Sequence, residues 1–319
     1  MDGSKFLQFE LWKDCTHNCA FCFNKPWRHL FNKQYRLENL DYAINYLKNE
    51  DLSEFSYIGY IGGEFFDGAL RDKDTRDKFY ELMDLTVDLI NSGKMKRFQF
   101  TANLLYHTAA DEDDFFGFLN YLHDNTDLSK CLLCTSYDLK YRFVNEQERE
   151  NWFRYMHLIK QSAIYNKLNL HVEMIPAQFF IDAVLDNSFD IKAFKKDLQC
   201  ELDIADIHTG FYWKSKYDMQ KELPDFFPRR QDFLKFLEKV FTEDTLTRDN
   251  ICHFNSMAYT LYFPRPPEFT GAKSMMTERS GKEVRLPYGH QETSDYIDSD
   301  DSMLEDIQDM WDMTRWLRN

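Results

Sequence analysis

The chain has 319 residues, 43% of them hydrophobic, which predicts one large domain or about two, with ample material for a core. Its formal net charge of −15 disfavours direct binding to duplex nucleic acid, because a strongly acidic field repels the phosphate backbone. The chain has no long apolar run and no signal-like N-terminus, and its odd number of cysteines, seven, fits a reducing compartment. We therefore expect a cytoplasmic protein without a membrane partner.

The first predicted strand, residues 6–12, leads directly into a loop that holds Cys15, Cys19 and Cys22 in a C-x3-C-x2-C pattern. Three thiolates in so short a loop are typical of a metal centre. Zinc normally takes further ligands from a second cysteine or histidine pair, and no such pair follows. A four-iron cluster held by three cysteines leaves one iron open, so iron and sulfur fit better. His17, inside the loop, is an alternative fourth ligand.

A helix predicted at residues 37–49 precedes a second strand at 57–61, which ends in Gly62, Gly63 and Glu64. Glycines at a strand end let the backbone approach a ligand more closely than any Cβ would allow. A simple turn is the alternative.

The third predicted strand, residues 98–103, lies between helices at 74–92 and 115–123 and ends in Thr101 and Asn103. Short polar side chains at a strand exit either aim into a pocket or form a turn, and the sequence leaves both interpretations open.

The fourth predicted strand, residues 131–138, contains Cys131 and Cys134, which point to opposite faces because side chains alternate along a strand. We expect both thiols to be buried and structural. Ser136 and Asp138 share one face at the polar exit of this strand.

A helix at residues 151–165 precedes the fifth predicted strand, 168–176, in which apolar residues alternate with Asn169, His171 and Glu173. A barrel interior that holds a substrate would need such a polar face, whereas a face covered by helices would not. His171 and Glu173 are therefore candidates for substrate contact or proton handling, and an exposed strand face is the alternative.

A further helix at residues 191–199 and a sixth strand at 206–213 complete six strand–helix repeats. Such repeats predict an α/β fold with parallel strands and right-handed crossovers. Ligands should collect at the carboxyl ends of the strands.

The cysteine loop, with Phe21 directly before Cys22, and the strand-end motifs that come after it in order resemble the radical S-adenosylmethionine (SAM) superfamily over residues 5–230. The resemblance implies a partial (β/α)6 TIM-like barrel and a [4Fe-4S] cluster on Cys15, Cys19 and Cys22. In that family the open iron chelates SAM, which is cleaved reductively to a 5′-deoxyadenosyl radical that abstracts a hydrogen atom from the substrate. It also implies an electron donor such as flavodoxin or ferredoxin.

The resemblance further implies roles in binding SAM. The aromatic side chain before the third cysteine helps to position the adenine, the Gly-Gly-Glu segment contacts the amino group, and the exit of the fourth strand contacts the ribose or carboxylate. Phe65 stands where proline is usual in the family. The implied cofactor-binding residues are Phe21, Gly62, Gly63, Glu64, Thr101, Asn103, Ser136 and Asp138.

Residues 231–319 are predicted to form a C-terminal extension with a helix at 233–241, a hairpin around 280–286 and a helix at 303–317. Their order resembles the SPASM or twitch extension of peptide-modifying relatives. Those extensions carry several cysteines for auxiliary clusters, whereas this segment carries only Cys252.

We expect a cluster-free extension that shapes or caps the active site. An auxiliary cluster on Cys200 and Cys252, with help from Cys131 or Cys134, is the alternative.

The expected function is that of a radical SAM enzyme acting on a peptide or protein, with a nucleotide or another small metabolite as the second substrate class. An activase for a glycyl radical enzyme shares the cysteine spacing, but the long C-terminal segment is unexpected for it. A non-enzymatic iron–sulfur protein is the competing class; it would usually supply a fourth cysteine and would not need Gly62, Gly63 and Glu64.

Overall fold

The computed structural model describes residues 5–12, 14–20, 22, 32–204, 223, 228–247, 250, 258–261, 274–277, 282–285 and 313. Its centre is a seven-stranded sheet with the order β6-β5-β4-β3-β2-β1-β7, in which every pairing is parallel. The strands are β1 (Lys5–Trp12), β2 (Phe55–Gly62), β3 (Arg97–Thr101), β4 (Cys131–Tyr137), β5 (Asn169–Met174), β6 (Glu201–Ile204) and β7 (Ala258–Leu261).

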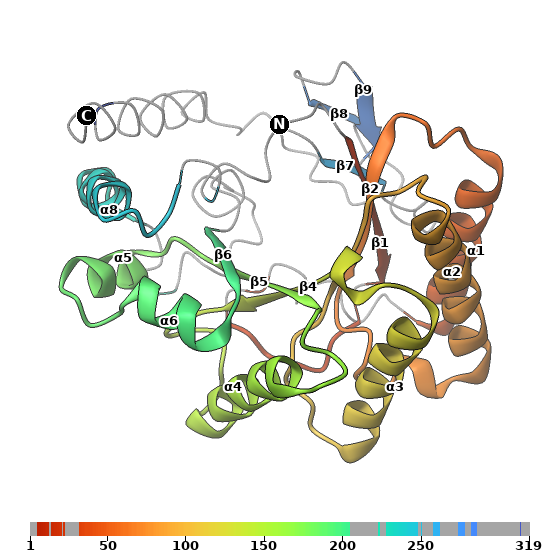
Figure 1. Cartoon of the computed structure of the whole chain (residues 1–319), viewed down its shortest axis with the longest axis horizontal. Coiled ribbons are helices and arrows are strands. Elements are labelled where there is room, and N and C mark those ends of the chain that lie inside the picture. Colours follow the sequence, from red (N-terminus) through yellow and green to blue (C-terminus); the bar gives the residue numbers. More distant parts are fainter. Residues whose placement is uncertain are drawn as a thin grey trace.

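Helices connect consecutive strands and follow one another around the outside of the strands (Figure 1). Several begin at a side-chain cap, as at Asp72 before α2, and at Thr108 before α3, where a capping box with Asp111 forms. The helices are α1 (Lys33–Asn49), α2 (Lys73–Asn91), α3 (Ala109–Asn125), α4 (Glu146–Gln161), α5 (Gln178–Leu185), α6 (Ile191–Leu198) and α8 (Arg230–Thr242). The predicted α/β class with parallel strands is confirmed.

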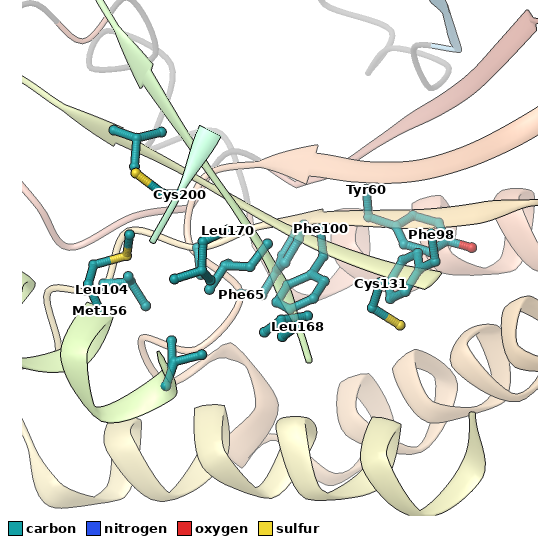
Figure 2. Close-up of a cluster of buried hydrophobic side chains, with 14 of the residues drawn as sticks. Tyr60, Phe65, Phe98, Phe100, Leu104, Cys131, Met156, Leu168, Leu170 and Cys200 are labelled. Carbon is teal, nitrogen blue, oxygen red and sulfur yellow. The ribbon is translucent and has the colours of Figure 1, made fainter. Parts of the chain in front are cut away.

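One face of the sheet packs against the helices and forms the core. Figure 2 shows Phe98, Phe100, Cys131 and Leu170 between the strands and the helices, and all four are buried. The same face of β1 contributes Leu7, Phe9 and Leu11, which are also buried. Burial of this apolar surface is the main source of stability for the fold.

The opposite face of the sheet is polar. Registered partners on adjacent parallel strands point to the same face. Cys134 and His171 therefore lie side by side on one face, and Glu173 and Asp203 form the next row on that face. The apolar residues Phe6, Tyr57, Ile61 and Leu132 also lie on this face, at its β1 to β4 side. Its polar residues and its cysteine are Gln8, Gln99, Thr101, Cys134, Ser136, Asn169, His171, Glu173, Glu201 and Asp203. The predicted alternation of β5, with one polar face and one helix-covered face, is confirmed.

The structure differs from the sequence-based expectation in β6, α5 and β7. The sixth strand is Glu201–Ile204, whereas the predicted segment 206–213 lies outside the described residues. Helix α5 (Gln178–Leu185) was not predicted, because its apolar residues form a nearly continuous run instead of a helical period. Strand β7 comes from the C-terminal segment and pairs with β1, a long-range pairing that no local pattern reveals.

A two-stranded antiparallel sheet, β8 (Ser274–Thr277) with β9 (Lys282–Arg285), lies near the hairpin predicted at 280–286. The terminal helix predicted at 303–317 falls, apart from Met313, outside the described residues. Within the described part of the chain, no helix is both long enough and apolar enough to cross a bilayer.

Candidate functional site

The ends of β1 and β2 are joined by backbone hydrogen bonds that fix the cysteine loop to the Gly-Gly-Glu segment. The Gly63 amide donates to Trp12 O at 2.7 Å, and the Glu64 amide donates to Asp14 O at 2.8 Å. The buried Trp12 indole donates to Glu64 O at 3.1 Å. The residue just before Cys15 is therefore held directly against the end of β2.

Gly62 is required by the fold itself. A Cβ at this position would lie 2.1 Å from Trp12 O, and its φ of +158° is one that side chains rarely adopt. The close approach that glycine permits here is to the backbone of β1. Phe65, where the family motif has proline, packs edge-to-face on Trp12 with ring centroids 4.9 Å apart, so an aromatic core contact occupies the place of the expected turn residue.

Glu64 is fully buried, and its side chain ties the end of β2 to the end of β3. Its two carboxyl oxygens accept hydrogen bonds from the backbone amides of Phe66, at 3.1 Å, and Asn103. Burial raises the pKa of Glu64 to about 8, Asp67 adds to the rise, and the two amide hydrogen bonds oppose it.

The loop after β3 reaches the cysteines through Asn103. Its side-chain amide lies 3.4 Å from Cys15 Sγ, while its backbone amide donates to Glu64. Thr101, at the end of β3, is half-buried on the polar face and pairs with Cys134. The side chain of Asn103 therefore contacts the cysteine loop, whereas Thr101 lies at the end of β3, two residues earlier.

Arg142, which follows β4, is a buried cation that links the ends of β3 and β4. It is 2% exposed, and its guanidinium donates to Ser136 Oγ at 2.8 Å, to Asn103 O at 2.9 Å and to Asn103 Oδ1 at 3.3 Å. These hydrogen-bond acceptors are neutral, and the carboxyl groups of Asp138 and Glu64 interact with the guanidinium through their charges alone. A buried guanidinium whose hydrogen bonds go to neutral oxygens favours binding of an anion.

Asp138 shapes the loop that carries Arg142. Its Oδ1 accepts from the backbone amides of Lys140, at 2.7 Å, and Tyr141. Tyr141 O in turn accepts from the Ala20 amide at 2.9 Å, which ties this loop to the cysteine loop. Burial raises the pKa of Asp138, and these amide hydrogen bonds oppose the rise.

The cysteine loop contains one buried thiol, Cys19, and two half-buried thiols, Cys15 and Cys22. The Cys22 amide donates to Cys19 O at 3.2 Å, which turns the chain between the second and third cysteines. Among the residues that the structure describes, no three histidine, cysteine or acidic side chains converge as the ligands of a metal ion would. Phe21 lies outside the described residues.

The loop is also held by polar contacts to its surroundings. The Thr16 amide donates to Asp67 Oδ2 at 2.6 Å, and Asp14 pairs with Arg36 of α1. His17 is buried, and its Nδ1 lies 3.2 Å from His107 Nε2.

Buried side-chain atoms without a hydrogen-bond partner gather at this end of the sheet. Such atoms are rare in native proteins and are expected where a ligand or a water molecule completes the site. Within the described part of the chain they include Asp14 Oδ1, Arg36 Nε, Tyr106 OH, Asp138 Oδ2 and Arg142 Nε.

His171 and Glu173 lie on the same polar face but on β5, beside these contacts rather than among them. His171 Nε2 is 2.8 Å from Asp203 Oδ2 on β6, and Glu173 is half-buried in register with Ser136.

The other cysteines do not form a second cluster within the described residues. Cys131 lies on the helix-packed face and Cys134 on the polar face, both buried, as predicted. Burial raises the pKa of Cys131 to about 12 and that of Cys134 well above its usual value. Cys200 is also buried, and Cys252 lies outside the described residues.

Arg142 and Asp203 were missed by sequence reasoning. Arg142 follows a strand exit by several residues and belongs to no periodic pattern, whereas Asp203 lies in a four-residue strand that was not predicted. The available signal for Asp203 was alternation: the residue lies between the apolar Leu202 and Ile204, which is the pattern of a short strand with one polar face.

The arrangement joins four loops at the carboxyl ends of β1 to β4, with sulfur donors, a buried cation and a buried carboxyl within one hydrogen-bonded network.

No protein-family model matches the chain, and no curated protein matches it in sequence, so its function is inferred from the motifs and the geometry of this site.

Proposed function

We propose that the chain is a radical SAM enzyme, which cleaves SAM reductively at a [4Fe-4S] cluster and abstracts a hydrogen atom from a substrate. The observation that carries the proposal is the junction of the cysteine loop with the Gly-Gly-Glu segment. Both segments carry motifs of the family in their sequence. The amides of Gly63 and Glu64 join them by donating to the backbone carbonyls of Trp12 and Asp14, just before Cys15.

The strand order supports a partial barrel. Strands β1 to β6 follow in chain order, and β7 lies on the other side of β1 instead of beside β6. A sheet that continues around from its last strand toward its first has the order of an open barrel. The polar face would then be the interior, and the helix-covered face the exterior.

The donor set of the loop fits an iron–sulfur cluster in its chemistry. Cys15, Cys19 and Cys22 supply three thiolates from one short loop, and the two half-buried thiols have access to an incoming metal. The chemistry that the cluster supplies when bound is one-electron reduction of SAM. The protein supplies binding, orientation and exclusion of water.

Roles for the surrounding residues follow from their charges. Arg142 would bind the carboxylate of SAM, because its guanidinium is buried and hydrogen-bonded to neutral oxygens. Glu64 would hold the ends of β2 and β3 in place through its amide contacts and remain protonated near neutral pH. Asn103 would orient Cys15 through its side-chain amide.

The test is anaerobic reconstitution with iron and sulfide, followed by dithionite and SAM, with chromatographic detection of 5′-deoxyadenosine. Formation that requires Cys15, Cys19 and Cys22 is the expected result. Cys19→Ala should lose the cluster and SAM cleavage, whereas Cys131→Ala, which alters a thiol on the far face of the sheet, should retain both.

A cluster that assembles without binding or cleaving SAM would overturn the proposal in favour of a non-enzymatic iron–sulfur protein. Full cluster content in Cys19→Ala would overturn the ligand assignment.

A further inference from the structure

Asn103, in the loop after β3, places a side-chain amide next to the first cysteine of the C-x3-C-x2-C loop. Its Nδ2 atom lies 3.4 Å from Cys15 Sγ. Sulfur is a larger acceptor than oxygen, so this separation is that of an N–H···S hydrogen bond. The two residues are 88 positions apart in the sequence, so the fold creates the contact.

Arg142 fixes which end of the Asn103 amide faces the sulfur. Its guanidinium lies 3.3 Å from Asn103 Oδ1. A guanidinium carries donors only, so the atom beside it must be the amide oxygen, and the NH2 group takes the side of Cys15. Arg142 is itself 2% exposed and bonded to Ser136 Oγ, so it holds the amide from a fixed position.

The backbone of Asn103 is held as well as its side chain. Its amide donates to Glu64 Oε2, and its carbonyl accepts from Arg142 at 2.9 Å. Leu104, the next residue, is fully buried and has a φ of +57°, a left-handed conformation that is unfavourable for a residue with a side chain. Such strain persists only where the surrounding contacts over-determine the backbone, so the position of Asn103 is firmly set.

We propose that Asn103 is a positioning residue that raises the reduction potential of the cluster by donating a hydrogen bond to the Cys15 thiolate, and that Arg142 keeps its amide in the donating orientation. The inference rests on the proposed radical SAM function. It extends the role of Asn103 from orienting Cys15 to controlling how readily the site accepts an electron.

The direction of the effect follows from charge. Reduction adds one negative charge, part of which resides on the thiolate ligands. An N–H group that points at Cys15 Sγ stabilises the reduced form more than the oxidised form and therefore raises the potential. Arg142 strengthens this effect, because a cation at Oδ1 polarises the amide and makes its N–H a better donor. Both contacts are partly buried, so water screens them less than it would at the surface.

The experiment is an EPR-monitored redox titration of the reconstituted full-length protein in the absence of SAM, so that no contact between Asn103 and SAM contributes. Asn103→Leu keeps the shape of the side chain but has no donor. At a fixed applied potential, its ratio of reduced to oxidised cluster should be about tenfold lower than in wild type, a shift of about 59 mV for a one-electron couple. The control is Asn169→Leu, the same substitution at an amide that donates to Ser129 O and Cys131 O, and it should match wild type.

A second measurement detects the contact in the wild-type protein. The reduced cluster is paramagnetic, so the nitrogen of an N–H···S bond to a ligand shows a hyperfine coupling in pulsed EPR. Protein made with side-chain ¹⁵N-labelled asparagine should show this coupling. Asn103→Leu should lack it, whereas Asn18→Leu, which alters an exposed asparagine of the cysteine loop, should retain it.

The role of Arg142 is tested by a double-mutant cycle on the potential. Arg142→Met should lower the potential more in the wild-type background than in Asn103→Leu, because part of its effect passes through the amide. Effects that simply add would show that Arg142 acts through its own charge, and would overturn its positioning role.

Equal potentials in wild type and Asn103→Leu would overturn the proposal, as would the absence of a ¹⁵N coupling in wild type, which decides the question even if Asn103→Leu assembles no cluster. Iron content and 5′-deoxyadenosine formation on addition of SAM are measured in the same wild-type preparation. If wild type holds the cluster and cleaves SAM, a negative result counts against this inference alone. If wild type does neither, the radical SAM function itself is overturned.

Discussion

Glu64 illustrates at the residue scale how burial sets the chemistry of the site. The carboxyl has no cation in hydrogen-bond contact among the described residues; its oxygens accept from the amides of Phe66 and Asn103. Two amide hydrogen bonds are too weak to offset complete burial, so the pKa is raised to about 8. Near pH 7 the neutral carboxyl of Glu64 therefore connects the end of β2 to the loop after β3 through these two hydrogen bonds.

This burial predicts a pH dependence of stability. The pKa of Glu64 is about 8 in the fold against an ordinary value of 4.5, so between these values the folded state binds more protons than the unfolded state. The free energy of unfolding of wild type should therefore fall as pH rises across this window, by up to about 1.4 kcal/mol per pH unit. Glu64→Gln, which cannot ionise, should lack this component. Urea unfolding of the cluster-free protein at pH 5, 6.5 and 8 measures the difference, and parallel pH profiles would contradict it.

Arg142 gives a second prediction at the same scale. Arg142→Met keeps much of the side-chain volume but removes the buried charge, so SAM affinity should fall about 10- to 100-fold, as expected for loss of a charged hydrogen bond worth roughly 1.5–3 kcal/mol. Arg97→Met is the control, because Arg97 is exposed at the opposite end of β3. Calorimetric binding of SAM to the reconstituted protein measures both. Equal affinities in the two variants would show that Arg142 does not bind SAM.

At the scale of elements, the junction of β1 and β2 places a backbone carbonyl where only a glycine fits. The register of the two strands shifts between Glu10 and Trp12, and Trp12 comes to pair with Gly62. This irregularity brings the Trp12 carbonyl against Gly62 and into reach of the Gly63 amide. The bulge thus aims the start of the cysteine loop at the end of β2.

Gly62→Ala should therefore destabilise the protein by about 1–3 kcal/mol, since the new Cβ meets the Trp12 backbone, which cannot yield as a flexible side chain would. Gly117→Ala is the matched control: Gly117 lies within α3, and a Cβ there meets nothing within 4 Å. It should stabilise the protein by about 0.5–1 kcal/mol through helix propensity. Thermal and urea unfolding report both changes. A Gly62→Ala variant as stable as wild type would refute the close-approach argument.

At the scale of the whole molecule, the sheet has a helix-covered apolar face and a polar face with carboxylates, amides and a histidine. The order of strands places β6 at one end of the sheet, where it is paired with β5 alone among the described strands. Strand β4 has partners on both sides. The opening of the partial barrel that we propose would lie between β6 and β7.

Hydrogen exchange tests whether the sheet ends at β6. Amides of β6 should exchange on the order of tenfold faster than those of β4, because an end strand with one partner opens locally at lower free energy than a central strand. Mass spectrometry of peptides covering Cys131–Tyr137 and Glu201–Ile204 measures the ratio. Equal protection would indicate a further partner for β6 and a closed barrel.

The sequence by itself determined the α/β class, the strand–helix order through β5, and the motifs at the strand ends. These features are local: the alternation of β5, the helical spacing of Leu40, Ile44 and Leu47 in α1, and the burial of Cys131 and Cys134 all follow from side-chain direction along one element.

Only the tertiary structure decided which of these residues meet. The contacts of Asn103 with Cys15, of Arg142 with Ser136 and Asn103, and of His171 with Asp203 join different elements. Likewise, no local pattern in the sequence predicts strand β7 or its pairing with β1. The reason is physical: periodicity reports which face of an element a side chain takes, whereas contacts between elements depend on strand order and register, which the packing of the whole chain sets.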